Sequence, residues 1–206
     1  ASVSGGPYAI TVAPGTSSGS YTITYATPGT ITVNPKALTV TGTTVANKAY
    51  DATTSAVLTG GTLVGVANNE ALTLVQAGTF ASANVGTGLA ITATDSITGA
   101  TVANYTLTQP TGLSANIIKK ALTITANNDA RFAGQTDTAG YYGVSYVGFA
   151  SGESSSNLST LPTITRSNSS VGTAGSYTGV LVPSGAAATN YSFSYVNGNY
   201  TIVGAN

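Results

Sequence analysis

The side chains that could carry acid–base chemistry are few in this sequence and far apart. The acidic residues number six, Asp51, Glu70, Asp95, Asp129, Asp137 and Glu153, and there is no His and no Cys. A glycoside hydrolase needs two carboxyl groups that face each other across a cleft, whereas isolated acids between strands usually accept hydrogen bonds from nearby backbone N–H groups. The scattered spacing favours the second interpretation. Because Ser–His pairs, Cys–His pairs and the usual zinc ligands are all excluded, we predict no catalysis and no cofactor.

Calcium binding and a covalent cross-link are two further kinds of chemistry that the sequence could carry. Asn127-Asn128-Asp129 and Asn68-Asn69-Glu70 supply oxygen ligands of the kind calcium takes, but no spaced Asp-x-Asp-x-Asp loop is present. We therefore predict no metal site. A covalent Lys–Asn cross-link formed beside a buried acid would have its best neighbourhood at Lys48 and Asp51. We expect Lys48 instead to extend its alkyl stem towards solvent.

Surface sites for sugars are the remaining candidates. Tyr141 and Tyr142 fall outside the regular pattern of the other tyrosines, and we predict that they form a surface aromatic patch. Asn-x-Ser/Thr sequons, which are glycosylation acceptors where the host has the machinery, begin at Asn104, Asn157, Asn168, Asn190 and Asn199. Since Asn104 and Asn190 begin equivalent strands, a structural role competes there. Asn157 and Asn168 are the predicted glycosylation sites.

The elements that must position these residues are strands. Apolar residues alternate with Thr or Ser in runs such as Leu72–Val75, Tyr105–Thr108 and Leu122–Thr125, which suits a pleated surface with one buried face. Turn residues separate the runs, and no stretch has a helical period. We predict an all-β fold of tandem β-sandwich, immunoglobulin-like domains in line, with a β-grasp-like sheet as the alternative.

The composition narrows the function further. Charged residues make up 6% of the chain and the net charge is zero, against roughly 25% charged residues in an ordinary soluble domain. A nucleic-acid partner would require a face rich in Lys and Arg, so none is expected. No apolar run approaches the roughly 20 residues of a membrane-spanning helix, and we predict no membrane insertion of this segment.

The sequence also repeats itself, which divides the chain. The run from Lys36 to Thr41 returns from Lys120 to Thr125, and the run from Tyr21 to Val33 aligns without a gap on the run from Tyr191 to Val203. We predict the C-terminal part of one unit over residues 1–35, a complete unit over 36–118 and a second over 119–206. The joints contain no Gly/Ser tract, so the units are expected to form a stiff rod.

Two segments carry a resemblance to known families. Asn47-Lys48-Ala49-Tyr50-Asp51-Ala52-Thr53-Thr54 resembles the YDG domain of large bacterial exoproteins, with Ala52 where that family has Gly. Residues 120–206 resemble the MBG domain, through the Lys-Ala-Leu-Thr-Ile-Thr start, the run from Tyr146 to Glu153 and the run from Val171 to Tyr177. Residues 1–35 resemble the tail of another MBG domain. The resemblance implies an exported adhesin of the filamentous-haemagglutinin-like type.

These observations predict a structural stalk or fibre segment of a bacterial adhesin or extracellular matrix filament, located outside the cell or on its surface. The expected partners are neighbouring repeats or copies of the chain itself, joined through strand edges. Residues 1–35 are expected to pair with a missing upstream half or with a neighbouring molecule. The alternative is a carbohydrate-binding module that uses Tyr141, Tyr142 and loop Asn residues to hold a cell-surface or matrix polysaccharide.

Overall fold

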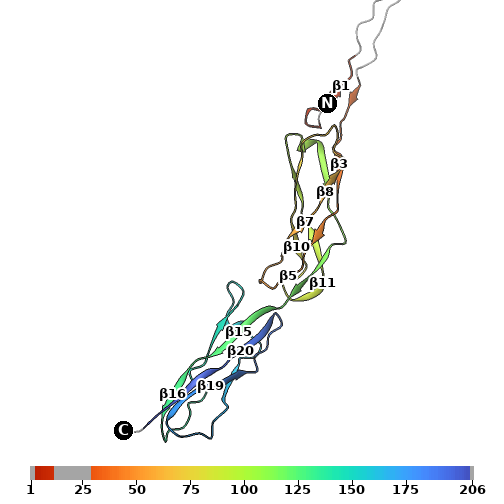
Figure 1. Cartoon of the computed structure of the whole chain (residues 1–206). Helices are drawn as coiled ribbons and strands as arrows, with labels where there is room; N and C mark the ends of the chain where they lie inside the picture. Colours follow the sequence, from red (N-terminus) through yellow and green to blue (C-terminus); the bar gives the residue numbers. More distant parts are fainter. Residues whose placement is uncertain (1–2, 12–28, 205–206) are drawn as a thin grey trace, which may run out of the picture. The chain divides into compact units, whose positions relative to one another are not determined.

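The structure is a computed structural model that describes residues 3–11 and 29–204 (Figure 1). Strands form almost all of its regular structure, and the described residues contain three short 3-10 turns and no α-helix. The predicted all-β class is confirmed. No described helix is long and apolar enough to cross a membrane. Most of the predicted run from Tyr21 to Val33 lies outside the described residues.

The chain folds into two compact units whose segments alternate along the sequence. Unit 1 consists of residues 1–45, 56–79 and 91–113, and unit 2 consists of residues 46–55, 80–90 and 114–206. The predicted limits at 35/36 and 118/119 rest on the sequence repeats alone and stay a prediction.

Unit 1 is organised around strand β3 (Lys36–Thr41). β3 pairs in parallel with β13 (Tyr105–Thr108) and antiparallel with β8 (Thr62–Val64). The other pairs are β1 (Tyr8–Ala9) with β2 (Thr30–Ile31), β4 (Thr44–Val45) with β7 (Leu58–Thr59), and β9 (Thr73–Val75) with β12 (Ser96–Thr98). Alternation places Leu38 and Val40 of β3 among the buried residues of unit 1, which also include Leu58, Ile91 and Tyr105.

Unit 2 contains two sheets formed by the C-terminal part of the chain. One has the order β17 (Val144–Val147), β15 (Lys120–Ala126), β20 (Tyr191–Val196), and the other has the order β16 (Asp129–Phe132), β21 (Gly198–Val203), β19 (Gly175–Ser184), β18 (Thr163–Arg166). Leu122 and Ile124 of β15 are fully buried, and so is Leu181 of β19. The core therefore follows the period-two pattern of the sequence.

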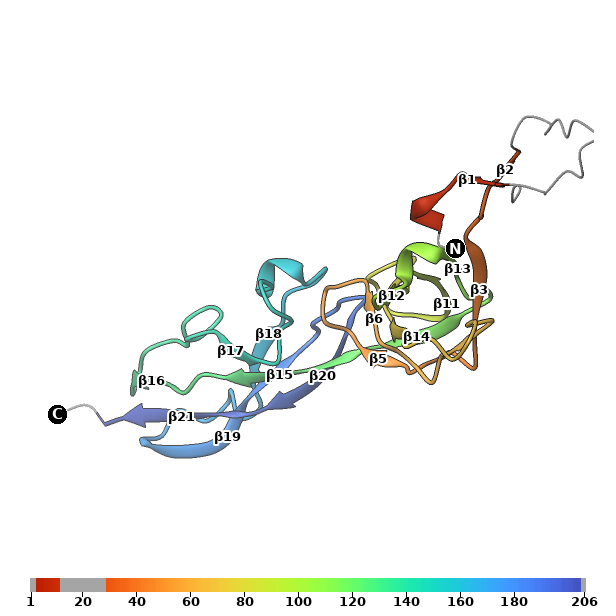
Figure 2. The same ribbon diagram turned by 90° about the horizontal axis from the view of Figure 1, so that it is seen from above.

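A further sheet has the order β5 (Lys48–Ala49), β14 (Ser114–Ile118), β11 (Gly86–Ala93), β10 (Gly78–Phe80), β6 (Ser55–Ala56). In unit 2, β14 pairs in parallel with β5 and antiparallel with the first part of β11. Only Lys119 separates β14 from β15, and Figure 2 shows the chain running on from one strand into the other.

The repeated sequence produces a repeated strand pairing. Lys36 lies opposite Tyr105 at the start of the β3–β13 pair, and Lys120 lies opposite Tyr191 at the start of the β15–β20 pair. Both pairs are parallel, as are β5–β14 and β16–β21. Because parallel strands need a long connection, each unit joins strands that are far apart in the sequence. This arrangement brings the tyrosines that begin β13 and β20 next to turns from the middle of the repeat.

Candidate functional site

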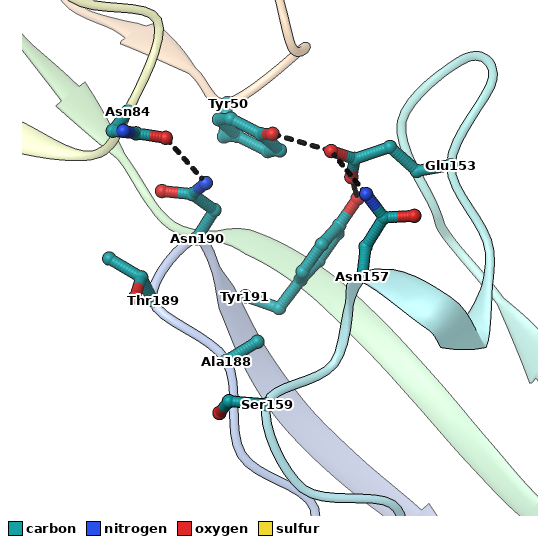
Figure 3. A pocket seen from close by; sticks show the side chains of 9 residues that line it. All are labelled: Tyr50, Asn84, Glu153, Asn157, Ser159, Ala188, Thr189, Asn190 and Tyr191. Atoms are coloured by element: carbon teal, nitrogen blue, oxygen red, sulfur yellow. Dashed lines mark hydrogen bonds between the residues drawn. The ribbon is translucent and has the colours of Figure 1, made fainter.

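A polar pocket of about 320 Å³ in unit 2 is the candidate site (Figure 3). Its walls come from the end of β5, the segment before β11, the 3-10 turn η3 (Ser155–Asn157) and the start of β20. The lining residues are Tyr50, Asn84, Glu153, Asn157, Ser159, Ala188, Thr189, Asn190 and Tyr191. Most of these side chains are polar, and Glu153 is the only charged residue of the lining.

Glu153 is the centre of the hydrogen bonds that line this pocket. Its carboxylate accepts one hydrogen bond from the Tyr50 hydroxyl, at 2.6 Å, and another from the Tyr191 hydroxyl. The Tyr191 hydroxyl in turn accepts a hydrogen bond from the backbone N–H of Ala150, at 2.9 Å. The rings of Tyr50 and Tyr191 meet edge to face, with centroids 5.6 Å apart. Both tyrosines are buried, and the carboxylate that they bind is partly exposed in the pocket.

The turn that presents Glu153 is specified by local sequence. The Glu153 N–H donates to the Ala150 carbonyl at 3.0 Å, and Gly152 between them has a φ of +81°, a conformation that glycine adopts without strain. Ser154 caps η3, since its N–H donates to Asn157 Oδ1 while its hydroxyl accepts from the Ser156 N–H. These bonds fix the turn that carries the Glu153 carboxylate.

Both tyrosines of the pocket have raised pKa values. Burial is the largest cause for Tyr191, and with the hydrogen bond to Glu153 it raises the pKa of that hydroxyl to about 12. For Tyr50 the hydrogen bond to Glu153 is the largest cause, followed by burial. A hydroxyl that resists ionisation is a stable hydrogen-bond donor and a poor general base near neutral pH. The arrangement is suited to holding groups in place rather than to moving protons.

Asn190 closes the opposite wall. Its Oδ1 accepts a hydrogen bond from the Val85 N–H at 3.0 Å, and its Nδ2 donates to Asn84 Oδ1 at 2.9 Å. The Asn190 carbonyl also accepts from the Lys120 N–H at the start of β15. This sequon asparagine therefore fixes two segments of unit 2 at the beginning of β20, one through its side chain and the other through its backbone carbonyl.

Unit 1 contains contacts that correspond to those of Tyr191 and Asn190. The Tyr105 hydroxyl donates to Glu70 Oε2 at 3.0 Å and accepts from the Ala67 N–H at 3.1 Å. Asn104 Oδ1 accepts from the Val3 N–H at 3.0 Å. We call this arrangement, Glu70 with Tyr105 in unit 1 and Glu153 with Tyr191 in unit 2, the tyrosine–glutamate clamp. A cavity of about 200 Å³ adjoins the clamp of unit 1.

Sequence reasoning treated Glu70 and Glu153 as scattered acids and missed the clamp. The signal that could have found it is a second echo, in which Val64-Gly65-Val66-Ala67 corresponds to Val147-Gly148-Phe149-Ala150 with a Glu three positions later. Both glycines have positive φ, and a Cβ on Gly148 would lie 2.4 Å from the Ala121 carbonyl oxygen. Glycine is required where the turn passes β15 so closely.

Two segments of the chain match known domain families. Residues 34–112 match the family model of the YDG domain, and residues 122–201 match that of the MBG domain of the YGX type. The chain carries a YDG domain and an MBG domain. The resemblance expected for these two segments is confirmed, while the MBG tail expected over residues 1–35 and the adhesin context stay predictions. Both families are repeat-type domains without catalytic activity. No curated protein and no solved structure matches the chain.

The MBG domain has a second buried polar cluster, centred on Asp137. Asp137 accepts hydrogen bonds from Arg131, Arg166, Tyr141 and Tyr200, at distances of 2.8 to 3.2 Å. Burial acts to raise the pKa of Asp137, but the bonds from Arg166, Tyr200 and Arg131 outweigh it, so the pKa is lowered. The side chain of Arg166 is almost inaccessible to solvent and that of Arg131 is 11% exposed, so both guanidinium groups are held within the cluster by Asp137.

The two predicted patch residues have different environments in the MBG domain. Tyr141 is half-buried, packs against the core and contacts the Tyr200 ring edge to face at 5.8 Å. Tyr142 is 66% exposed. The two rings do not share an exposed surface, so only Tyr142 is open to a ligand, and binding there stays a prediction.

The predicted glycosylation sites also differ from each other. Asn157 is exposed, but its Oδ1 accepts the Ser154 N–H of the η3 cap. Asn168 is half-buried, and its Oδ1 accepts a hydrogen bond from Arg166 at 3.2 Å. A glycan is attached at the amide nitrogen, so on Asn168 it would have to fit beside the buried Arg166 side chain, whereas one on Asn157 would alter the rim of the pocket.

The neighbourhood predicted for a cross-link contains an ion pair. Lys48 Nζ lies 2.8 Å from Asp51 Oδ1 and donates to the Thr53 carbonyl at 2.8 Å. It also lies 5.4 Å from the centroid of the Phe80 ring. The expectation that Lys48 extends into solvent is wrong, because three acceptors and a ring hold its ammonium group against the protein.

The remaining acids are bound to separate backbone groups. Asp95 and Asp129 are buried, and their Oδ1 atoms accept hydrogen bonds from the N–H groups of Ala77 and Ala130. Their Oδ2 atoms find no hydrogen-bond partner among the described residues, for which the surroundings give no physical reason. Within the described ranges, no three His, Cys, Asp or Glu residues are grouped as a metal site would require.

Proposed function

We propose that the chain is a non-catalytic spacer segment in the stalk or fibre of a large bacterial adhesin or matrix filament. The observation that supports this most directly is the bond from Tyr50 to Glu153. Tyr50 lies in the sequence of the YDG domain and Glu153 in that of the MBG domain, yet both belong to one compact unit. The carboxylate therefore fastens the two domain sequences to each other within unit 2.

The chain path supports the same proposal. Lys119 is the only residue between β14 and β15, and neither strand contains glycine. A Gly/Ser linker would let its ends wander as a random coil, whereas a joint of one residue between paired strands leaves little freedom. A spacer that transmits its length needs joints of this kind.

The surface is compatible with work outside the cell. With 6% charged residues, the chain presents mainly Thr, Ser, Asn and Gly to water, and few charges are there to be screened by salt. Outer strands β17 and β20 expose Val147 and Val196. We include in the proposal that copies of the chain associate through such strand edges.

Location is tested on intact cells that produce the protein. Antibodies raised against residues 36–206 should label the cell surface or the secreted material, and protease added outside the cells should abolish the label. Label that appears only after the cells are opened would contradict the proposal.

Stiffness is tested by distance measurements between spin labels. The chain has no Cys, so Thr87→Cys and Thr178→Cys place two labels on exposed sites of unit 2 without background labelling. We expect a narrow distance distribution. It should broaden when Tyr50→Phe removes the hydroxyl that donates a hydrogen bond to Glu153. A distribution that is already broad with Tyr50 present would refute the spacer role.

A further inference from the structure

The Glu153 pocket has more polar capacity than the tyrosine–glutamate clamp uses. Asn84 Oδ1 accepts from Asn190, but within the part of the chain that the structure describes Asn84 Nδ2 has no protein partner. Asn157 Nδ2 lies 3.5 Å from Glu153 Oε1, a weak contact that leaves its second N–H unused. The hydroxyl of Thr189, also on the rim, makes no hydrogen bond to the described residues.

Acceptors lie beside these donors. A carboxylate offers about four lone-pair sites, and Glu153 receives two tyrosine hydroxyls and one weak amide contact. The Ser159 hydroxyl donates to the Ala187 carbonyl at 2.9 Å, so its oxygen is free to accept. Figure 3 shows Glu153 and Asn157 beside the Tyr50 and Tyr191 rings, with Asn84 and Asn190 facing them from the other side.

We propose that this pocket binds one neutral pyranose residue of a polysaccharide. Sugar hydroxyls both donate and accept, and neighbouring hydroxyls can bond an amide N–H and a carboxylate oxygen together. The volume of about 320 Å³ lies at the lower end of the range for small-molecule sites. Only Ala188 and the two rings supply apolar surface, so the pocket suits a polyhydroxylated ligand better than an apolar one.

Charge selects against acidic sugars. Glu153 is the only charged residue in the lining, with no Lys or Arg to receive a carboxylate or sulfate. A uronate would bring a second negative charge close to Glu153 without a counter-charge. The pocket should therefore distinguish neutral from anionic sugars.

The cavity at the clamp of unit 1 supplies an internal comparison. It is smaller, about 200 Å³, it includes Lys36, and it has a single tyrosine, Tyr105. We assign Asn84, Asn157 and Thr189 to sugar binding. In the smaller cavity only Asn34 and Asn68 could take the place of the two asparagines, and no threonine lines it. We expect no sugar to bind there.

The test is a titration of the whole chain, labelled with ¹⁵N, with the methyl glycosides of glucose, galactose, mannose and N-acetylglucosamine. For a single sugar residue we expect a Kd of about 1 mM for the best of them. The amide signals of Asn84, Asn157 and Asn190 should shift, and methyl glucuronide should leave them unchanged. The spacer role is judged by other measurements and does not depend on this result.

Asn84→Asp is the decisive variant, because it keeps the acceptor for Asn190 and replaces the free amide donor by a carboxylate oxygen. We expect it to weaken the best sugar at least about tenfold, the effect of losing one hydrogen bond. Thr178→Ala, an exposed change elsewhere in unit 2, should leave the Kd unchanged.

Three results would overturn the proposal. They are the absence of a shift with every neutral glycoside, shifts centred on Tyr142 rather than on the pocket, and an Asn84→Asp chain that binds as well as the original. Binding of the glucuronide as tight as that of the glucoside would refute the argument from charge.

Discussion

The tyrosine–glutamate clamp of the MBG domain is best tested by Tyr191→Phe. The substitution keeps the buried ring and removes only the hydroxyl, which accepts from the Ala150 N–H and donates to Glu153. A buried N–H left without a partner costs about 1–3 kcal/mol, and a hydrogen bond to a charged group contributes about 1.5–3 kcal/mol. Since the two contributions share one atom and are not additive, we expect a loss of about 3 kcal/mol in the free energy of unfolding.

The assay must report on unit 2 alone, because a chain of two units need not unfold in one step. Hydrogen exchange of the Leu122 and Ile124 amides serves this purpose, since both residues are fully buried in β15 next to β20. Tyr142→Phe is the matched control. Tyr142 is 66% exposed, so removal of its hydroxyl should change the free energy of unfolding by less than about 0.5 kcal/mol. If Tyr191→Phe fell within that range too, the clamp would not stabilise the domain.

Three other perturbations follow from the same contacts. Tyr191 and Tyr200 have pKa values raised from 10.0 to about 12. Their contribution to stability is therefore complete below pH 10 and is lost as the pH rises through 12. Urea unfolding at several alkaline pH values, with tyrosine ionisation followed by absorbance, measures this loss. The pKa of Asp137 is lowered from 3.8, so its contribution is present above that value and is lost as the pH falls below it, which acid unfolding measures, with Asp137→Asn expected to flatten the curve. Gly148→Ala places a Cβ 2.4 Å from a backbone oxygen and should lower the melting temperature far more than Gly152→Ala. Gly152 is the control because its φ is +81° but a Cβ there would meet open space. Equal effects would mean that the close approach at Gly148 is relieved at little cost.

The strands could be predicted from the sequence because their cause is local. Alternation of apolar residues and Thr places Leu122 and Ile124 on one face whatever lies opposite. The partners could not be predicted in this way. Lys120 lies beside Tyr191, 71 positions later, and nothing in either segment specifies that the two strands run parallel. The pairing is set by which buried faces meet in the folded unit.

The candidate site was hidden for a related reason. Spacing shows where acids are in the sequence, but Glu153 acquires its role from two tyrosines, 103 and 38 positions away. Tyr141 and Tyr142 show the opposite difficulty. They are neighbours in a turn where Tyr141 has a φ of +51°, so no period says which ring turns inward, and the structure packs one and exposes the other.

The recurrence of the clamp changes how the sequons at Asn104 and Asn190 should be interpreted. Each asparagine accepts a backbone N–H, and each precedes a tyrosine whose hydroxyl binds a glutamate from an Ala-x-x-Glu turn. That glutamate lies 35 positions before Tyr105 and 38 before Tyr191. The Asn-Tyr pair at a strand start, with Ala-x-x-Glu at this separation upstream, therefore has a structural role in both units. A glycan on Asn190 would be attached at Nδ2, the atom that donates to Asn84 Oδ1, so it would have to displace Asn84 from the beginning of β20.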